Sequence, residues 1–361
     1  MKYTSCEAIE QGIAFMHNYV TFCCNYSHEG GGFDSSPFMV YGDTKEISID
    51  WEKYFKSKDY IREQNKTDMP YPECKGCLYL MNMNWNNDNQ KLSYINFNHW
   101  KDCDTNCIYC GIKEAPGKIK IPKLYKSLKE LEKKHLIEEK GMVMFGGGDI
   151  AFLPEFKDIV RLFKKYNYSF NIATSATHYV PILSELLKEG SVEIRISVDS
   201  AKEETFRKIK RTTFYNTVWN NMKRYAKVQK IPYCVRSKFI IIPNVNDSKE
   251  EIDLWLKKTK ECGVKSILLD IEGGYYRKHK NSIPESIYEL FEYTKDRAKE
   301  FDLYFLVFDH ASQMLSENNN YLSEYYFFKD ITQHKIKECI TKNIENRNKS
   351  LLNKLLGKLN L

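Results

Sequence analysis

The distribution of cysteines is the feature that most restricts how this chain can fold. Eight of the eleven cysteines lie within the first 110 residues, and three of them, Cys103, Cys107 and Cys110, share one short segment. The N-terminus, MKYTSCEAIEQG, lacks a basic stretch followed by an apolar one, so we expect no secretory signal and a cytoplasmic location. Reducing compartments disfavour disulfides, so clustered cysteines there indicate metal ligands first.

The composition is that of a globular protein with a large core. The 361 residues are 42% hydrophobic and 29% charged, which fits one large domain with a small appendage. No apolar run reaches about 18 residues, so no membrane span is expected. The net charge is +7, but residues 329–361 alone hold eight Lys/Arg against three Asp/Glu. The rest of the chain has too small a basic surplus to favour nucleic-acid binding.

From about residue 92 the chain alternates short β-type runs with amphipathic segments. Phe156, Ile159 and Phe163, for example, recur at helical spacing. Such alternation predicts an α/β domain whose parallel strands are buried on both faces. The predicted strands are residues 92–98, 142–145, 170–174, 193–199, 235–242, 266–272 and 304–308.

The two ends of the chain have a different character. Residues 1–91 do not alternate, and so few periodic segments predict a small Cys-rich module that a metal helps to hold. We therefore expect three parts: residues 1–91, a main domain over 92–315 and a basic helical tail over 316–361. In the tail, Leu351, Leu355 and Leu359 fall on one helical face. This face is predicted to dock on the main domain, with a partner or a membrane surface as the alternative.

The three clustered cysteines have the spacing C-x3-C-x2-C just after a predicted strand. A structural zinc site takes four ligands, whereas three thiolates leave one iron of a 4Fe–4S cluster open to a small molecule. With Tyr109 directly before Cys110, the segment resembles the signature of the radical S-adenosylmethionine (AdoMet) superfamily.

A glycine run follows the second predicted strand, in MFGGGDIAFLPEF. Alone it indicates a loop, in which missing Cβ atoms let the backbone approach a ligand closely. Its distance from the cysteines resembles that of the superfamily's Gly-Gly-Glu-type motif, which holds the AdoMet amino group. The resemblance implies that Gly147, Gly148 and Asp149 bind AdoMet, although Asp149 is one methylene shorter than the usual Glu.

Three further residues are implied as AdoMet contacts by the same resemblance. Thr174 ends the third strand, where a helix cap is the alternative explanation. Ser197 is implied to contact the ribose, and strand alternation predicts that Asp199 shares its face. Arg211 is implied to pair with the methionine carboxylate, with a solvated basic run, KIKR, as the alternative.

The resemblance covers roughly residues 92–310 and implies a partial (β/α)6 TIM-like barrel. It implies a 4Fe–4S cluster and AdoMet as cofactors, a flavodoxin- or ferredoxin-type electron donor, and hydrogen abstraction from a substrate by a 5′-deoxyadenosyl radical. It identifies no catalytic side chain. Asp270, Glu272, Asp309 and His310 are candidate substrate-facing groups, with satisfied loop or cap residues as the alternative.

The remaining early cysteines resemble the auxiliary-cluster modules called SPASM or twitch domains. Cys6, Cys24, Cys74 and Cys77 would supply four thiolates and close a second 4Fe–4S site, although such modules usually follow the barrel. Cys23 is the alternative to Cys24. A zinc knuckle and a set of simple thiols are alternatives to the cluster itself.

The expected function is an oxidoreductase reaction on a small molecule such as a sugar or alcohol. A second cluster that accepts an electron from the substrate radical would make the reaction a two-electron oxidation. A peptide or protein maturase that forms cross-links or oxidises a side chain is the first alternative. A non-enzymatic zinc scaffold is the second, and iron and sulfide content would distinguish it.

Overall fold

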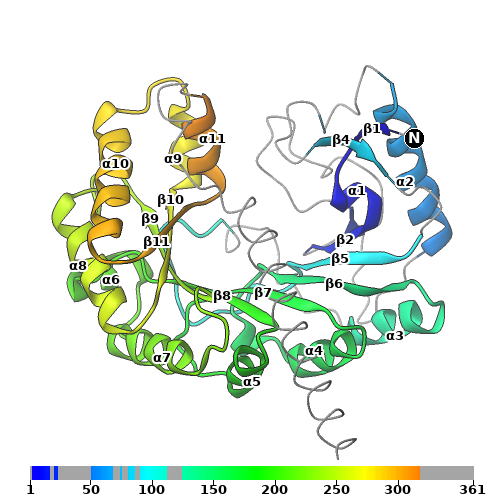
Figure 1. Ribbon diagram of the computed structural model, residues 1–361, viewed down its shortest axis with the longest axis horizontal. Helices are drawn as coiled ribbons and strands as arrows, with labels where there is room; N and C mark the ends of the chain where they lie inside the picture. The colour runs from blue at the N-terminus through cyan, green and yellow to red at the C-terminus, as the bar shows by residue number, and fades with distance from the viewer. Residues whose placement is uncertain are drawn as a thin grey trace, which may run out of the picture.

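The structure is a computed structural model that describes residues 2–16, 20–22, 50–67, 74, 80–85, 90–111 and 124–317. One curved sheet forms the centre of the protein. Within these residues the sheet has nine strands in the order β11-β10-β9-β8-β7-β6-β5-β2-β3. Every neighbouring pair is parallel except β2 with β3. The sheet bends into an open arc (Figure 1). The predicted α/β fold with a mostly parallel sheet is confirmed.

All seven predicted strands form, and most boundaries differ from the prediction by one or two residues. Strand β6 is the exception, because it begins at Ile137 rather than residue 142. Polar residues 138–141 hid this extension, and the register with β5 shifts there. The seven strands are β5 (Leu92–Phe97), β6 (Ile137–Phe145), β7 (Ser169–Thr174), β8 (Val192–Ser197), β9 (Val235–Ile241), β10 (Ser266–Ile271) and β11 (Tyr304–Val307).

Helices connect the parallel strands, and α4, α5, α7, α8 and α10 lie on the convex side of the arc (Figure 1). Their ends follow local sequence signals. Pro181 is the first residue of α5, and Gly190 ends it in the left-handed conformation at φ 80°. The bounds are α3 (Tyr125–Lys133), α4 (Phe156–Lys164), α5 (Pro181–Glu189), α6 (Glu203–Lys210), α7 (Tyr215–Val228), α8 (Lys249–Glu261), α9 (Gly273–His279), α10 (Glu285–Glu300) and α11 (Asp309–Glu317).

Strand alternation decides which side chains face the inside of the arc. Ser237 of β9 accepts a hydrogen bond from Trp255 Nε1 of α8 at 2.7 Å, so it points toward the helices. Its neighbours Arg236 and Lys238 therefore point to the concave side, which is charged rather than apolar. The ion pairs on that side are Arg236 with Glu193 at 3.1 Å and Lys238 with Asp270 at 3.6 Å.

Residues before 92 extend the same sheet. Strand β2 (Gly12–Phe15) is parallel to β5, and β3 (Val20–Thr21) pairs antiparallel with β2. The ring of Phe97 is stacked between those of Phe15 and Phe145, each at a centroid distance of 5.2 Å. The sheet is therefore larger than the six strands that the resemblance implied, because the N-terminal segment contributes to it.

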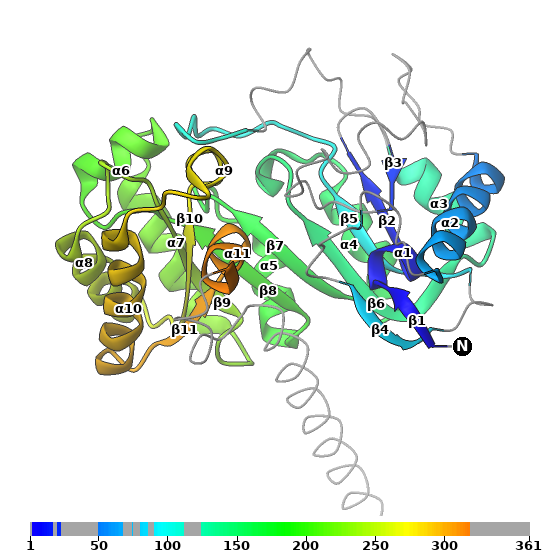
Figure 2. The ribbon, with the colours of Figure 1, turned by 90° about the horizontal axis from the view of Figure 1, so that it is seen from above.

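The rest of the described N-terminal part packs at this end of the sheet, opposite α8 and α10 (Figure 2). It comprises α1 (Glu7–Gln11), α2 (Trp51–Asn65) and a two-stranded sheet of β1 (Lys2–Ser5) with β4 (Met81–Asn84). Within the described chain, no helix has the length and apolar character that crossing a membrane requires. The predicted tail over 316–361 lies, beyond Glu317, outside the described residues.

We predict that Phe15→Ala destabilises the main domain, because Phe15 is fully buried against Phe97. Loss of a buried phenyl ring costs about 3–5 kcal/mol. Urea unfolding followed by circular dichroism measures this, with Tyr60→Ala as the control because Tyr60 is 57% exposed. An unchanged midpoint for Phe15→Ala would contradict the packing of β2 on the main sheet.

Candidate functional site

The predicted cofactor residues gather at the carboxyl ends of adjacent strands. The three cysteines follow β5, the glycine run follows β6, and Thr174 and Ser197 are the last residues of β7 and β8. These four strands are neighbours in the sheet, so their ends lie side by side. This is the edge at which parallel α/β folds place binding sites.

Two of the three cysteine sulfurs meet at one hydroxyl. Thr105 Oγ1 lies 3.1 Å from Cys103 Sγ and 3.6 Å from Cys107 Sγ. Burial raises the pKa of the Cys103 thiol, whereas its hydrogen bond with Thr105 acts in the opposite direction. A bound metal would have to displace the thiol proton, as metal binding to thiolates does. Cys110 is half-buried on the same loop, and its N–H donates to Cys107 O at 3.2 Å.

The chemistry of this donor set fits an iron–sulfur cluster, although the ligands are not gathered in advance. Across the described ranges, no three Cys, His, Asp or Glu side chains enclose a metal-sized space. The three thiols nevertheless share one loop of eight residues, Cys103 to Cys110. Metal binding would draw them together, and it would bring its own binding free energy to do so.

The carboxyl end of α6 anchors the cysteine loop. Asn106 N–H donates to Lys210 O at 2.9 Å and Ile108 N–H to Ile209 O at 3.0 Å, so the loop caps helix carbonyls that otherwise lack partners. The Lys210 ammonium donates to Tyr109 OH at 2.8 Å and pairs with the Asp199 carboxylate. Sequence reasoning did not find this anchor, because it joins residues about a hundred positions apart.

The prediction for Asp199 was wrong in one respect. Strand β8 ends at Ser197, and Asp199 lies beyond it in the left-handed conformation at φ 56°, so alternation does not relate the two residues. Asp199 is buried and accepts from Ile240 N–H at 2.9 Å. It therefore holds the cysteine loop through Lys210, while Ser197 is half-buried at the strand end.

The glycine run packs against the cysteine-bearing segment. Gly146 N–H donates to Phe97 O at 3.0 Å and Gly148 N–H to Trp100 O at 2.8 Å. A Cβ atom on Gly147 would lie 2.6 Å from Trp100 O, closer than side chains tolerate. The missing Cβ atoms, which we predicted to admit a ligand, thus admit the backbone that leads to Cys103.

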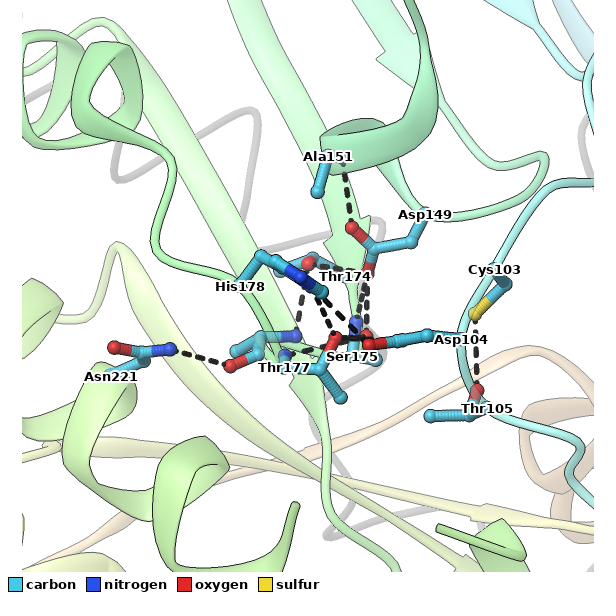
Figure 3. Close-up of polar contacts among 11 residues, drawn as sticks. Cys103, Asp104, Thr105, Asp149, Ala151, Thr174, Ser175, Thr177, His178 and Asn221 are labelled. Carbon is cyan, nitrogen blue, oxygen red and sulfur yellow. Dashed lines mark hydrogen bonds and ion pairs between the residues drawn. The ribbon is translucent and has the colours of Figure 1, made fainter. Parts of the chain in front are cut away.

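Asp149 ties this junction to the next strand (Figure 3). Its Oδ1 accepts from Ala151 N–H at 2.9 Å, which caps the short helix η3 (Ile150–Phe152). Its Oδ2 accepts from Thr174 Oγ1 at 2.8 Å and from both Ser175 N–H and Ser175 Oγ at 2.7 Å. The carboxylate is 3% exposed and already has four donors. A contact between this carboxylate and AdoMet would therefore have to replace one of them.

A second polar link joins the turn after β7 to the cysteine loop (Figure 3). Thr177 Oγ1 donates to Asp104 Oδ1 at 2.8 Å, and Asp104 Oδ2 lies 3.3 Å from His178 Nδ1. The His178 ring lies between those of Phe152 and Phe214, at centroid distances of 5.2 and 6.2 Å. The sequence signal for this link is that Thr177 and His178 follow shortly after the end of a strand, and no role was predicted for either residue.

Other predicted residues have different surroundings. Arg211 follows α6 as an exposed residue at φ 51°, one position beyond the anchor Lys210. Glu272 caps α9 by accepting from Gly274 and Tyr275 N–H groups, which is the alternative that we had kept for it. Asp270 accepts from Ala311 N–H at 3.0 Å besides pairing with Lys238.

Two of the four early cysteines can be placed. Cys6 directly precedes α1 and is buried, and Cys74 is buried with its Sγ 3.9 Å from Asn65 Nδ2. Cys24 and Cys77 lie outside the described residues, as does the alternative, Cys23. The four-thiolate site therefore stays a prediction, with both described members close to α2.

Asp149→Asn is predicted to destabilise the cluster-free protein strongly. An amide offers one acceptor where four donors converge, and leaving buried donors unpaired costs about 2–4 kcal/mol. Thermal unfolding checks this against Asp158→Asn, an exposed aspartate on α4. If both variants melt like the wild type, Asp149 does not hold these strand ends together.

Comparison with known proteins finds a family match for the central part of the chain. Residues 97–256 match the family model of the Radical SAM superfamily. This stretch runs from the end of β5 into α8 and contains the cysteine loop, the glycine run and Asp199. The match begins after the early cysteines, so the SPASM/twitch-like module stays a prediction.

Relatives and solved structures cover part of the chain. A GTP 3′,8-cyclase of Clostridium botulinum (strain Okra) is 26% identical over 180 residues, 48% of this chain and 54% of that protein. One from Desulforamulus reducens is 24% identical over 187 residues, 49% and 55% respectively. This chain thus spans about half the length of these curated relatives. The structure of Streptococcus suis SuiB bound to precursor peptide SuiA matches at TM-score 0.48 and 14% identity, over 74% of this chain and 57% of SuiB.

Proposed function

Because residues 97–256 match the family model of the Radical SAM superfamily, we propose that this protein is a radical AdoMet enzyme with its first cluster on Cys103, Cys107 and Cys110. When bound and reduced, a 4Fe–4S cluster supplies the electron that splits AdoMet into methionine and a 5′-deoxyadenosyl radical, which takes a hydrogen atom from the substrate. The observation that carries the proposal is that the segment leading into the cysteine loop is bonded backbone-to-backbone to the glycine run at neighbouring strand ends.

The protein side chains position these groups. Thr105 orients two sulfurs, and the α6 carboxyl end together with the glycine run fixes both sides of the loop. We propose that AdoMet lies along the ends of β6 to β8. Its contacts would be Gly147, Gly148, Thr174, Ser197 and Arg211, with Asp149 joining only if a bond to Thr174 or Ser175 is given up.

The substrate we propose is a polar small molecule that undergoes oxidation. Lys238 lies next to Ser197 in the sheet register and pairs with Asp270, so the concave side beside Ser197 is polar and suits a polar molecule better than an apolar one. The relatives that share the matched half are named for GTP, which is also small and polar. A peptide or protein substrate is the alternative, and labelled substrates distinguish the two.

We further propose a second cluster on Cys6, Cys24, Cys74 and Cys77. Four thiolates close a 4Fe–4S site, so such a cluster would serve electron transfer rather than bind AdoMet. It would accept the electron left on the substrate radical, and the proton would leave to solvent. A flavodoxin- or ferredoxin-type protein would supply the electron for the first cluster. A zinc site is the alternative for the second centre.

Anaerobically reconstituted protein is predicted to hold about eight irons and, once reduced, to release 5′-deoxyadenosine from AdoMet. Replacing Cys103, Cys107 and Cys110 together by Ala should abolish this release, since no open iron site remains. Chromatography of the nucleoside products measures it, with Cys262→Ala as the control because Cys262 is buried away from the loop near Trp219. Release by the triple variant would reject the assignment.

Cys74→Ala/Cys77→Ala is predicted to lower the iron content to about four per chain and to leave AdoMet cleavage in place. Iron and acid-labile sulfide assays measure the loss, and zinc analysis runs alongside. Iron that stays near eight would remove the second cluster from these cysteines. Zinc in place of the lost iron would support the zinc alternative.

The choice between substrates is tested by isotope transfer. Deuterated sugars and alcohols are expected to pass deuterium into 5′-deoxyadenosine, because the radical takes its hydrogen from the substrate carbon. Mass spectrometry of the nucleoside reads the transfer. Transfer from deuterated peptides alone would favour the maturase alternative.

A further inference from the structure

A buried ion pair lies beside the cysteine loop. The side chain of Lys210, the last residue of α6, is 3% exposed, and that of its partner Asp199 is 0% exposed. The Lys210 ammonium donates to Tyr109 OH at 2.8 Å and lies 5.3 Å from the centre of that ring. Burying an ion pair costs free energy that the attraction between the charges has to offset. Backbone bonds from Asn106 and Ile108 already hold the loop, so anchoring alone does not account for this pair.

The carboxylate of the pair is fixed in place by the end of β9. Asp199 Oδ1 accepts from Ile240 N–H at 2.9 Å, and Asn246 Nδ2 donates to the Asp199 carbonyl at 2.7 Å. The other carboxylate oxygen, Oδ2, accepts from Tyr109 OH and pairs with the ammonium. Because Asp199 is held through both its backbone and its side chain, it fixes the position of the ammonium and of the hydroxyl.

The positive charge of Lys210 reaches the cysteine sulfurs. Burial lowers the pKa of Lys210, but Asp199 and Cys107 raise it, and the net shift is upward, so the side chain stays an ammonium. The Cys103 charge raises it further. Burial first, then Asp199 and Cys107, raise the pKa of Tyr109 well above its ordinary value, so this hydroxyl stays neutral. One ammonium is thus the charge that acts on both thiols from this side of the loop.

We propose that Lys210 is a positioning residue of the first cluster, which holds Tyr109 in place and raises the reduction potential of the cluster. The proposal rests on the first cluster of the proposed function and adds a residue to it. The thiolates of Cys103, Cys107 and Cys110 would give an oxidised 4Fe–4S core a net negative charge, and reduction adds to that charge. A neighbouring cation therefore stabilises the reduced form more than the oxidised one.

The two members of the pair act on the cluster with opposite sign. Lys210 favours the reduced form, so that a flavodoxin- or ferredoxin-type donor would reduce a larger share of the cluster. Asp199 opposes this, because its negative charge lies beside the same loop. Removal of the ammonium and removal of the carboxylate should therefore shift the potential in opposite directions. A contact that only shaped the loop would give no such change of sign.

Redox titration of the full-length reconstituted protein, followed by electron paramagnetic resonance, tests the proposal on the signal that responds to AdoMet. Lys210→Met is expected to lower the midpoint potential by about 59 mV, the one-electron equivalent of a tenfold change in the equilibrium constant. Asp199→Asn should raise it, and Lys210→Arg, which keeps the charge, should stay near wild type. Lys208→Met is the matched control, because Lys208 is exposed on the same helix.

Folding is checked in the metal-free protein, because Lys210→Met leaves a buried carboxylate without its cation. Its thermal midpoint should fall, and the double variant Lys210→Met/Asp199→Asn should recover part of the loss, since both charges are then removed. Should the single variant not fold, the comparison of the double variant with Asp199→Asn isolates the ammonium. The potential should be lower in the double variant.

Potentials that are equal in wild type, Lys210→Met and Asp199→Asn would overturn the proposal. Shifts of the same sign in both single variants would do so as well, because they would indicate a contact that only shapes the loop. A cluster that forms and cleaves AdoMet with a potential independent of Lys210 would reject this inference alone. A wild-type protein with no iron–sulfur cluster on the cysteine loop would reject the proposed function together with it.

Discussion

The backbone hydrogen bonds between residues 97–102 and 146–149 hold in place the parts that the proposed chemistry needs. They continue the pairing of β5 with β6 past the ends of both strands, through Gly146, Gly148 and Asp149. The close approach requires glycine, because a side chain would overlap the opposite backbone. The cysteine loop is thereby fixed on one side, and the carboxyl end of α6 fixes the other. Metal binding would then have to draw together the thiols of Cys103, Cys107 and Cys110.

Strand positions could be predicted from sequence because buried parallel strands are continuous apolar runs between amphipathic segments. The same reasoning placed the candidate residues at strand ends, where the structure has them. It could not show which neighbours capture them, since those contacts cross between strands. Asp149 shows the difference, because motif position implied AdoMet whereas its carboxylate is bound by Thr174 and Ser175. The contacts of Asp104 with Thr177 and of Lys210 with Asp199 could not be predicted for the same reason.

The N-terminal part was harder to predict, and again for physical reasons. Strands β2 and β3 are four and two residues long, too short for a periodic signal, yet they extend the main sheet. Lys58 is buried although it lies in a run, KSKDYIR, that has the composition of a solvated helix face. Glu10 and Arg62 form a buried ion pair in the same part of the molecule. The interior at this end of the sheet therefore contains buried charges as well as apolar contacts.

The most direct test of the central claim is electron paramagnetic resonance of the anaerobic, reduced protein with and without AdoMet. A cluster held by Cys103, Cys107 and Cys110 has one open iron, so AdoMet binding should change the signal of the reduced cluster. The Cys74→Ala/Cys77→Ala variant should show the same change without a second signal. A signal that AdoMet leaves unaltered, or a protein that contains zinc and no iron, would contradict the account.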